Sequence, residues 1–219
     1  MVKEPTNDDA TRNLSIVLLR LGDADAAAGD GPEAKAAFDE SVDLARKRSE
    51  QLGQNSDSLS LIAGSLKAAG DGELALGQVS EALRNYSAGT DIARRLAMGP
   101  GRTDYVNTLV DMLGGYAFAK LQNREYSDAL ALSDEATALA PDQLWLLSNK
   151  AHALMFLGRS EQARKIYIEH VGEAVSGGEK WERTILDDFA TFKKLGMNNP
   201  EMKIISSESI EYSNAKNIK

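Results

Sequence analysis

The sequence predicts an all-α protein in which antiparallel helix pairs stack into a right-handed superhelical solenoid. Three observations predict this fold. The chain repeats itself internally, its apolar residues recur at helical spacing, and no stretch alternates apolar and polar residues as a half-buried strand does. One short helix pair cannot bury its apolar face alone, so neighbouring pairs must stack to complete a core.

The internal repeat is the strongest of these observations. Residues 18–47 align without gaps on residues 66–95, and ten of the 30 aligned positions are identical at an offset of 48. The identical pairs include Asp23 with Asp71, and most of the others are glycine or alanine. We therefore expect the two segments to form the same structure.

Each repeat is expected to form two helices that are joined at a glycine. In the first unit, large residues such as Leu18 and Phe38 fill the space between the helices, and small residues such as Ala34 let them approach closely. Gly29 is expected to adopt the left-handed conformation that ends the first helix.

The late part of each long second helix carries a basic cluster, Arg46-Lys47-Arg48 in the first unit and Arg94-Arg95 in the second. Cations near a helix C-terminus interact favourably with the helix dipole, which is a structural interpretation. The alternative interpretation is a basic binding patch.

The composition excludes several classes of partner. The formal net charge is -8 and the pI is about 4.9, so the chain lacks the basic footprint of a protein that binds nucleic acid or an anionic membrane. No run approaches the ~20 apolar residues of a membrane-spanning helix, and the first residues are too polar for a signal peptide. We expect a cytoplasmic protein. Because the chain has no cysteine, disulfides and thiolate chemistry are excluded.

The repeats resemble the tetratricopeptide repeat family. In the first unit the family pattern matches Leu21-Gly22, the turn residue Gly29, Ala34 and Phe38. The later units match at Gly70, Gly77, Ala82 and Tyr86, then at Ala129, Ala136 and Pro141, and then at Gly158, Ala163 and Tyr167. The resemblance implies helix pairs that stack into a superhelix with a concave and a convex side.

The resemblance covers residues 7–171, in four units of about 7–53, 54–99, 103–141 and 142–171. The first two units depart from the family because their longer second helices extend the period from 34 to 48 residues. In the third unit Arg124 replaces the turn glycine and Ser133 replaces the aromatic residue. These departures leave the third turn uncertain, but not the fold.

Residues 172–219 are expected to form a linker, a capping helix and a polar tail that frays. The capping helix has one apolar face, made by Trp181, Ile185, Leu186, Phe189 and Phe192, and it ends at Gly196. Asn199 followed by Pro200 is typical of a helix N-cap with proline at the first helical position. An alternative is that the apolar helix is exposed and binds a partner.

No motif in the chain supports catalysis, a metal site or a cofactor. The acidic stretch that starts at Asp23 fails three of the five ligand and glycine positions of a calcium-binding EF-hand loop, and no phosphate-binding signature follows it. His152 and His170 lie 18 residues apart without zinc-site spacing. We therefore expect no enzyme activity.

The resemblance implies that the first helix of each pair lines the concave groove and contacts the partner. The family's ligand-facing places correspond to Ile16, Leu19, Asp23, Ala26 and Ala27; Gly64, Lys67, Asp71, Leu74 and Ala75; Asp111, Gly114, Phe118, Leu121 and Gln122; and Trp145, Ser148, His152, Met155 and Phe156. Many of these are apolar and suited to packing between repeats. The polar or aromatic ones are the candidate partner-binding residues: Asp23, Lys67, Asp71, Phe118 and His152.

The predicted function is a non-catalytic scaffold that binds a peptide or protein partner in the groove. Chaperone adaptors of the family grip a C-terminal carboxylate with lysine and asparagine at places where this chain has Leu19 and Asp23, and its third unit offers Asp111 and Gly115 instead of basic residues. A chaperone-tail partner is therefore not expected.

Residues 140–202 resemble the C-terminal part of large bacterial proteins in which such repeats follow a caspase-like or other effector domain. This resemblance implies that the chain is a fragment of a longer bacterial protein. It also supports an alternative function, a sensor in which peptide binding changes the curvature of the array and controls an effector domain in cis or in trans. The partner, the oligomeric state and the choice between concave and convex binding faces stay open.

Overall fold

The computed structural model describes residues 7–99, 102–175 and 178–217, and these fold almost entirely into α-helices. The chain divides into two compact units, unit 1 (residues 1–119) and unit 2 (residues 120–219). The division falls inside the fifth helix, whereas the boundary expected between the repeats and the C-terminal segment, at residue 171, lies within unit 2. The predicted all-α fold is confirmed for the described residues.

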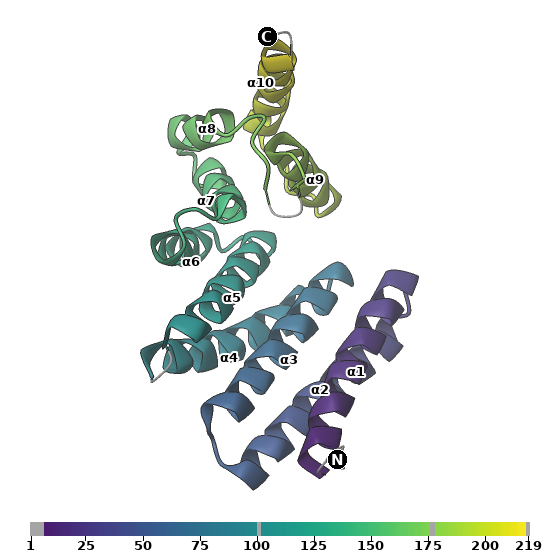
Figure 1. Ribbon diagram of the computed structural model, residues 1–219. Helices are drawn as coiled ribbons and strands as arrows, with labels where there is room; N and C mark the ends of the chain where they lie inside the picture. Colours follow the sequence, from purple (N-terminus) through teal and green to yellow (C-terminus); the bar gives the residue numbers. More distant parts are fainter. Residues whose placement is uncertain (1–6, 100–101, 176–177, 218–219) are drawn as a thin grey trace. The chain divides into compact units, whose positions relative to one another are not determined.

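Unit 1 contains α1 (Asn7–Ala28), α2 (Gly31–Leu52), α3 (Ser56–Ala75), α4 (Val79–Met98) and most of α5 (Arg102–Gln122). The helices α1 and α2 pack as a pair, α3 and α4 pack as a second pair, and α3 also contacts both helices of the first pair (Figure 1). The first helix of one pair, α1, therefore lies beside the first helix of the next pair, α3. This arrangement agrees with a helical repeat.

Unit 2 contains the end of α5, then α6 (Tyr126–Leu139), α7 (Leu144–Phe156), α8 (Ser160–Glu169), α9 (Trp181–Lys194) and α10 (Pro200–Asn217). Here α7 packs on α6 and on α8, and α10 packs on α8 and α9 (Figure 1).

The turn within each helix pair has the same backbone geometry in all four pairs. One residue adopts a left-handed φ: Gly29 (85°), Gly77 (75°), Arg124 (63°) and Gly158 (75°). The N–H of the next residue then donates to a carbonyl five residues earlier: Asp30 to Asp25, Gln78 to Glu73, Glu125 to Lys120 and Arg159 to Leu154, at 2.7 to 2.9 Å. These bonds satisfy carbonyls that the end of a helix leaves without partners. The predicted turn at Gly29 is confirmed.

The third turn, which the sequence left uncertain, has the same form despite its missing glycine. Arg124 takes the left-handed conformation that disfavours residues with a Cβ. Its guanidinium donates to the carbonyls of Leu195 and Gly196, at 3.3 and 3.5 Å, at the end of α9. The arginine thus makes contacts there that a glycine would lack.

Large rings on the second helices pack against glycines of the first helices. A Cβ on Gly22 of α1 would lie 2.6 Å from Cε1 of Phe38, and a Cβ on Gly72 of α3 would lie 2.1 Å from Cε2 of the same ring. Phe38, which is fully buried, therefore occupies space that only glycine leaves on both neighbouring first helices.

Tyr86 of α4 repeats this arrangement one pair later. Its ring lies against Gly70 of α3, where a Cβ would be 3.0 Å away, and against Gly115 of α5, where a Cβ would be 2.5 Å away. The close helix approach expected from the small residues is thus confirmed, and each ring is shared by two successive first helices.

The helix α9 buries four of the five residues of the predicted apolar face, because Trp181, Ile185, Phe189 and Phe192 are all at most 2% exposed. The fifth, Leu186, is partly exposed. The Trp181 indole donates to the Tyr167 carbonyl of α8 at 2.8 Å, and Phe189 and Phe192 lie against His152 of α7. The apolar face of α9 is thus covered by its own chain, as a capping helix requires, and is not exposed for a partner.

The last helix differs from the frayed polar tail that we expected. The predicted N-cap is confirmed, because the Asn199 side chain accepts from the Glu201 N–H at 2.9 Å while its amide donates to the Met155 carbonyl at 3.2 Å. From this start α10 continues to Asn217, with Met202, Ile205 and Ser209 buried along one side. This buried stripe, which occurs once per turn, explains why the segment is helical.

Candidate functional site

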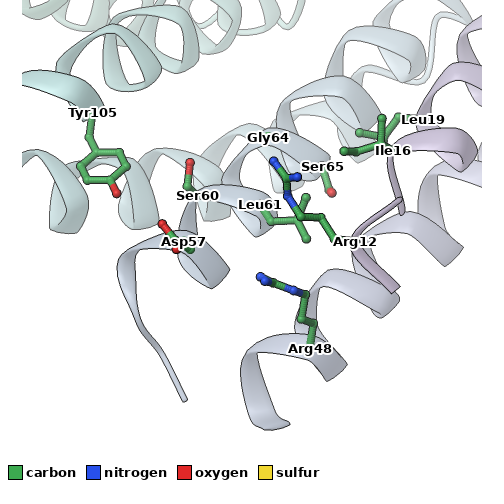
Figure 2. A pocket seen from close by; sticks show the side chains of 10 residues that line it. All are labelled: Arg12, Ile16, Leu19, Arg48, Asp57, Ser60, Leu61, Gly64, Ser65 and Tyr105. Atoms are coloured by element: carbon green, nitrogen blue, oxygen red, sulfur yellow. The ribbon is translucent and has the colours of Figure 1, made fainter. Parts of the chain in front are cut away.

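An open pocket of about 660 Å³ lies in unit 1, and we call it the α3 pocket. Four helices contribute its lining: Arg12, Ile16 and Leu19 of α1; Arg48 of α2; Asp57, Ser60, Leu61, Gly64 and Ser65 of α3; and Tyr105 of α5 (Figure 2). The volume lies within the range of ligand-binding pockets, about 300 to 1,000 Å³. Three of the lining residues, Ile16, Leu19 and Gly64, stand at the places that sequence analysis assigned to the groove.

The α3 pocket and two of the predicted binding residues share one face of α3. From Asp57 the lining residues follow at steps of three or four, through Leu61 to Gly64, and the same steps lead on to Lys67 and Asp71. Residues at this spacing lie above one another on a helix. We call this row the α3 stripe.

The polar groups of the α3 pocket include two guanidinium groups and one carboxylate. Arg12, which is exposed, and Arg48, which is 8% exposed, extend from α1 and α2 toward the space in front of α3, while Asp57 and Tyr105 lie toward the opposite end from Ile16 (Figure 2). Each guanidinium has five N–H donors and stays charged at any physiological pH. The α3 pocket can therefore accept a hydrogen-bond acceptor or an anion beside an apolar wall.

A buried hydroxyl cluster supports the wall of the α3 pocket. The hydroxyls of Ser15 and Ser41 lie 2.9 Å apart, and both lie within 3.4 Å of the Ser65 hydroxyl, which belongs to the lining. These three side chains come from α1, α2 and α3 and are fully buried. Because small, mutually satisfied polar groups join the three helices at this level, the wall is pre-formed.

The structure brings together two of the predicted residues, Lys67 and Asp71. The Lys67 ammonium lies 2.6 Å from Oδ2 of Asp71, whose Oδ1 accepts a 2.5 Å hydrogen bond from the buried Tyr86 hydroxyl. Partial burial raises the pKa of the Asp111 carboxyl on α5, an effect that nearby Lys67 opposes and nearby Asp71 reinforces. The far end of the α3 stripe is thus a charged network, partly occupied by contacts within the chain.

The other predicted residues in unit 1 lie on α1 and α5. Asp23 is about half exposed, and its carboxylate lies 4.0 Å from the Arg20 guanidinium. It continues the row of Arg12, Ile16 and Leu19 on α1, which is the helix side that lines the α3 pocket. Phe118 is partly exposed near the end of unit 1.

His152 lies in unit 2 and is fully buried. Its Nδ1 is 2.7 Å from the Tyr167 hydroxyl, and its Nε2 is 3.0 Å from the Asp188 carboxylate of α9. Both ring nitrogens therefore contact the chain itself, and the ring packs on Phe189 and Phe192. In this structure His152 joins α7, α8 and α9 and does not contribute to a surface.

Sequence analysis missed six lining residues of the α3 pocket: Arg12, Asp57, Ser60, Leu61, Ser65 and Tyr105. It treated Arg48 only as part of a basic cluster. The structure separates the members of that cluster, because Arg46 lies 3.9 Å from Asp43 on the surface while Arg48 lines the α3 pocket. The signal for Asp57 was available in its spacing from Gly64 and Lys67. Arg12 offered the same signal, because it stands four residues before Ile16 on α1, whereas no such spacing pointed to Arg48.

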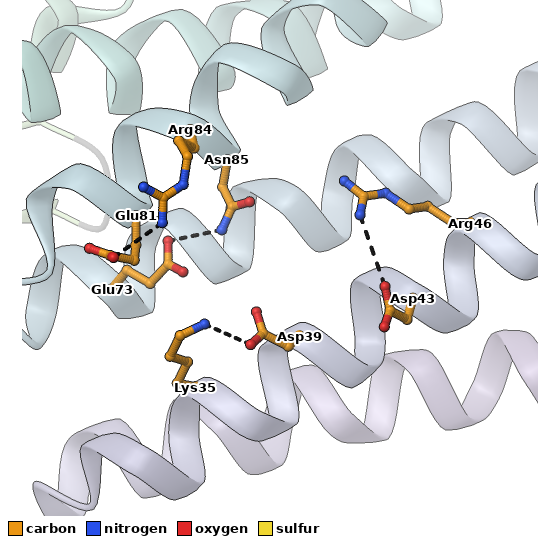
Figure 3. Close-up of polar contacts among 8 residues, drawn as sticks. All are labelled: Lys35, Asp39, Asp43, Arg46, Glu73, Glu81, Arg84 and Asn85. Atoms are coloured by element: carbon orange, nitrogen blue, oxygen red, sulfur yellow. Dashed lines mark hydrogen bonds and ion pairs between the residues drawn. The ribbon is translucent and has the colours of Figure 1, made fainter.

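A second polar cluster of unit 1 surrounds Glu73, which lies off the α3 stripe and is 2% exposed (Figure 3). The Asn85 amide donates to its Oε2 at 2.9 Å, and burial raises the pKa of Glu73 to about 6. Nearby, Lys35 pairs with Asp39 at 2.6 Å on α2, and its charge opposes the rise in the pKa of Glu73. This cluster joins helices and opens onto no described pocket.

The described residues contain no group of three or more His, Cys, Asp or Glu side chains placed to hold a metal ion. Within the same part of the chain, no helix is long and apolar enough to cross a membrane.

Fold and site together define an all-helical protein of packed helix pairs with an open, mixed polar and apolar pocket. No protein-family model matches the chain, and no curated protein matches it.

Proposed function

We propose that this protein is a non-catalytic interaction module that binds a peptide segment of a partner protein in the α3 pocket and along the α3 stripe. The observation that carries the proposal is the α3 pocket itself, which lies on the first helices α1 and α3 at places assigned to partner contact. We also propose that the helix pairs follow the right-handed stacking of tetratricopeptide repeats.

The chemistry of the α3 pocket favours a peptide over a small polar metabolite. One side of the α3 pocket is an apolar surface made by Ile16, Leu19 and Leu61. Ile16 is 37% exposed, and the other two are partly exposed. Arg12 and Asp57 offer charges of both signs in the same lining. A peptide supplies apolar side chains together with backbone donors and acceptors, so it complements both regions.

Selection of a phage-displayed peptide library against the full chain tests the proposal. A selected peptide would be labelled with fluorescein, and its binding would be measured by fluorescence anisotropy. We expect Arg12→Glu to weaken binding about tenfold or more, which corresponds to ~1.4 kcal/mol. Gly64→Leu should weaken it similarly, because a Cβ there meets open space and the longer side chain fills the pocket without disturbing the helix.

Lys47→Glu is the matched control, because it makes the same charge change as Arg12→Glu at an exposed position of α2 outside the lining. Its affinity for the peptide should equal that of the wild type. Circular dichroism must show that all three variants are folded. Selected peptides that bind the Arg12 and Gly64 variants as tightly as the wild type would contradict the proposal.

A further inference from the structure

A second pocket, of about 300 Å³, lies in unit 2, and we call it the α7 pocket. Its lining comes from three helices and one turn: Leu130 and Asp134 of α6, Lys150 and Leu154 of α7, Arg159 of the turn, and Gln162, Lys165 and Ile166 of α8. On each of the three helices two of these residues are four apart, so each helix contributes one row.

The α7 pocket differs from the α3 pocket in the kind of helix that lines it. Two of its three helices, α6 and α8, are second helices, whereas most of the α3 pocket is lined by first helices. The places assigned to partner contact in the fourth unit, such as Trp145 and His152, are absent from its lining.

The charges in the α7 pocket are unbalanced. Lys150 pairs with the Asp134 carboxylate at 2.8 Å, so these two charges offset each other. The Arg159 guanidinium donates to the uncharged Gln162 amide at 2.7 Å, and Lys165 is exposed. Among the described residues, no carboxylate lies within 4.0 Å of the charged groups of Arg159 or Lys165.

This positive surplus stands beside an apolar floor. Leu154 is 3% exposed at the base, while Leu130 and Ile166 are partly exposed beside it. The surplus charge of the α7 pocket is thus opposite in sign to the net charge of the whole chain, which is -8.

We propose that the α7 pocket binds an acidic amphipathic segment of a partner protein. One aliphatic side chain of that segment packs on Leu130 and Ile166, and a neighbouring carboxylate is bound by Arg159 and Lys165. Charge complementarity selects this occupant, because two cations that have no carboxylate partner among the described residues border the apolar floor. The proposal is independent of binding in the α3 pocket.

The test uses the peptide acetyl-Glu-Leu-Leu-Glu-amide as the probe, titrated into the ¹⁵N-labelled full chain and followed by amide chemical shifts. We expect the shift changes to concentrate on residues 130–134, 150–154 and 159–166. The double variant Arg159→Glu/Lys165→Glu should weaken binding about tenfold or more, because it replaces two attractions with two repulsions. The probe acetyl-Lys-Leu-Leu-Lys-amide should bind the wild type far more weakly than the acidic probe.

The control variant Lys194→Glu/Lys203→Glu makes the same charge change at exposed positions of α9 and α10 and should bind the probe as the wild type does. Equal binding of the acidic probe to the Arg159/Lys165 variant, or shift changes centred on the α3 pocket, would overturn the proposal. If sodium acetate at the same concentration caused the same shift changes, the α7 pocket would be a simple anion site, and the proposal would also be overturned. Analytical ultracentrifugation provides a last check. If the wild type were a dimer and the double variant a monomer, the occupant of the α7 pocket would be a second copy of the chain, and the proposal would be wrong.

Discussion

The Tyr86 hydroxyl donates a 2.5 Å hydrogen bond to the carboxylate of Asp71, which stands fifteen residues earlier in the chain. His152 and Tyr167 are joined at the same separation, at 2.7 Å. Asp71 and His152 were both predicted to contact a partner, and both are held by the ring of their own second helix. Asp23 stands fifteen residues before Phe38, whose ring has no hydroxyl. Asp23 therefore lacks such a bond.

The Tyr86–Asp71 bond predicts a measurable contribution to stability. Tyr86→Phe should lower the free energy of unfolding by about 1 to 2 kcal/mol, since a hydrogen bond to a charged group is lost while the ring stays in place. Urea denaturation followed by circular dichroism measures the change. Phe38→Tyr is the reciprocal variant, which offers Asp23 a hydroxyl at the equivalent place and should not destabilise the protein. A loss for Phe38→Tyr as large as that for Tyr86→Phe would refute the equivalence of the two pairs.

The contact between Phe38 and Gly72 predicts that alanine is poorly tolerated at position 72. A Cβ there would lie 2.1 Å from the ring, so Gly72→Ala should destabilise the protein by about 1 to 3 kcal/mol through overpacking. Gly64→Ala on the same helix is the matched control, because its Cβ meets nothing within 4 Å. It should stabilise the helix by up to about 1 kcal/mol. Thermal unfolding of both variants compares them directly, and a similar effect at the two positions would contradict the packing argument.

The buried carboxyl of Glu73 predicts a pH-dependent stability. Its pKa is raised from 4.5 to about 6 by burial, so between these values the folded state binds more protons than the unfolded state. The contribution of this carboxyl to the free energy of unfolding therefore falls as the pH rises from 4.5 to 6. Glu73→Gln should be more stable than the wild type at pH 7.5, by about 1 to 2 kcal/mol, with the Asn85 bond kept.

Urea denaturation of both proteins at pH 7.5 and pH 4.0 measures this difference. The advantage of Glu73→Gln should shrink at pH 4.0, where the wild-type carboxyl is protonated in the folded state. Other acidic groups are common to both proteins and cancel in the comparison. An advantage that is independent of pH would show that the carboxyl's charge is not its cause.

The contact between His152 and Asp188 predicts how firmly α9 is held. Asp188→Ala leaves Nε2 of the buried imidazole without its partner, which should cost about 1 to 3 kcal/mol. Asp187→Ala is the control one residue away, where an exposed pair with Arg183 is lost at a cost of about 0.5 kcal/mol or less. Urea unfolding, followed by Trp181 fluorescence in a Trp145→Phe background, reports on α9. Equal losses for the two variants would contradict this role of Asp188.

Much of the local structure could be predicted from the sequence because short-range rules determine it. Gly29 and Gly77 end helices as expected, since glycine adopts a left-handed φ at little cost. Asn199 before Pro200 begins α10 for an equally local reason. Arg124 was harder, because its favourable contacts come from residues 71 and 72 positions later. No local rule contains that information.

The candidate site was less accessible to prediction for the same reason. Ile16, Leu19 and Gly64 follow from their places in the repeat, but Arg12 and Arg48 reach the α3 pocket only because two different helices direct long side chains toward α3. His152 occupies a groove place in the repeat pattern, yet α9 returns to cover it from a segment 36 residues away. Long side chains and non-local packing were thus the two sources of error.

The sharing of Phe38 between Gly22 and Gly72, and of Tyr86 between Gly70 and Gly115, bears on how such a chain can grow by gene duplication. The pair α3–α4 carries the Tyr86 ring together with Gly70 and Gly72, so a copy of this whole pair brings one ring and the glycines that receive rings from either side. Every ring, old or new, then still meets a glycine on both neighbours. A copy that ended within a pair would leave a ring facing a residue with a Cβ. The step of 48 residues between the first two units spans a whole pair, and it preserves Gly22 of α1 as Gly70 of α3.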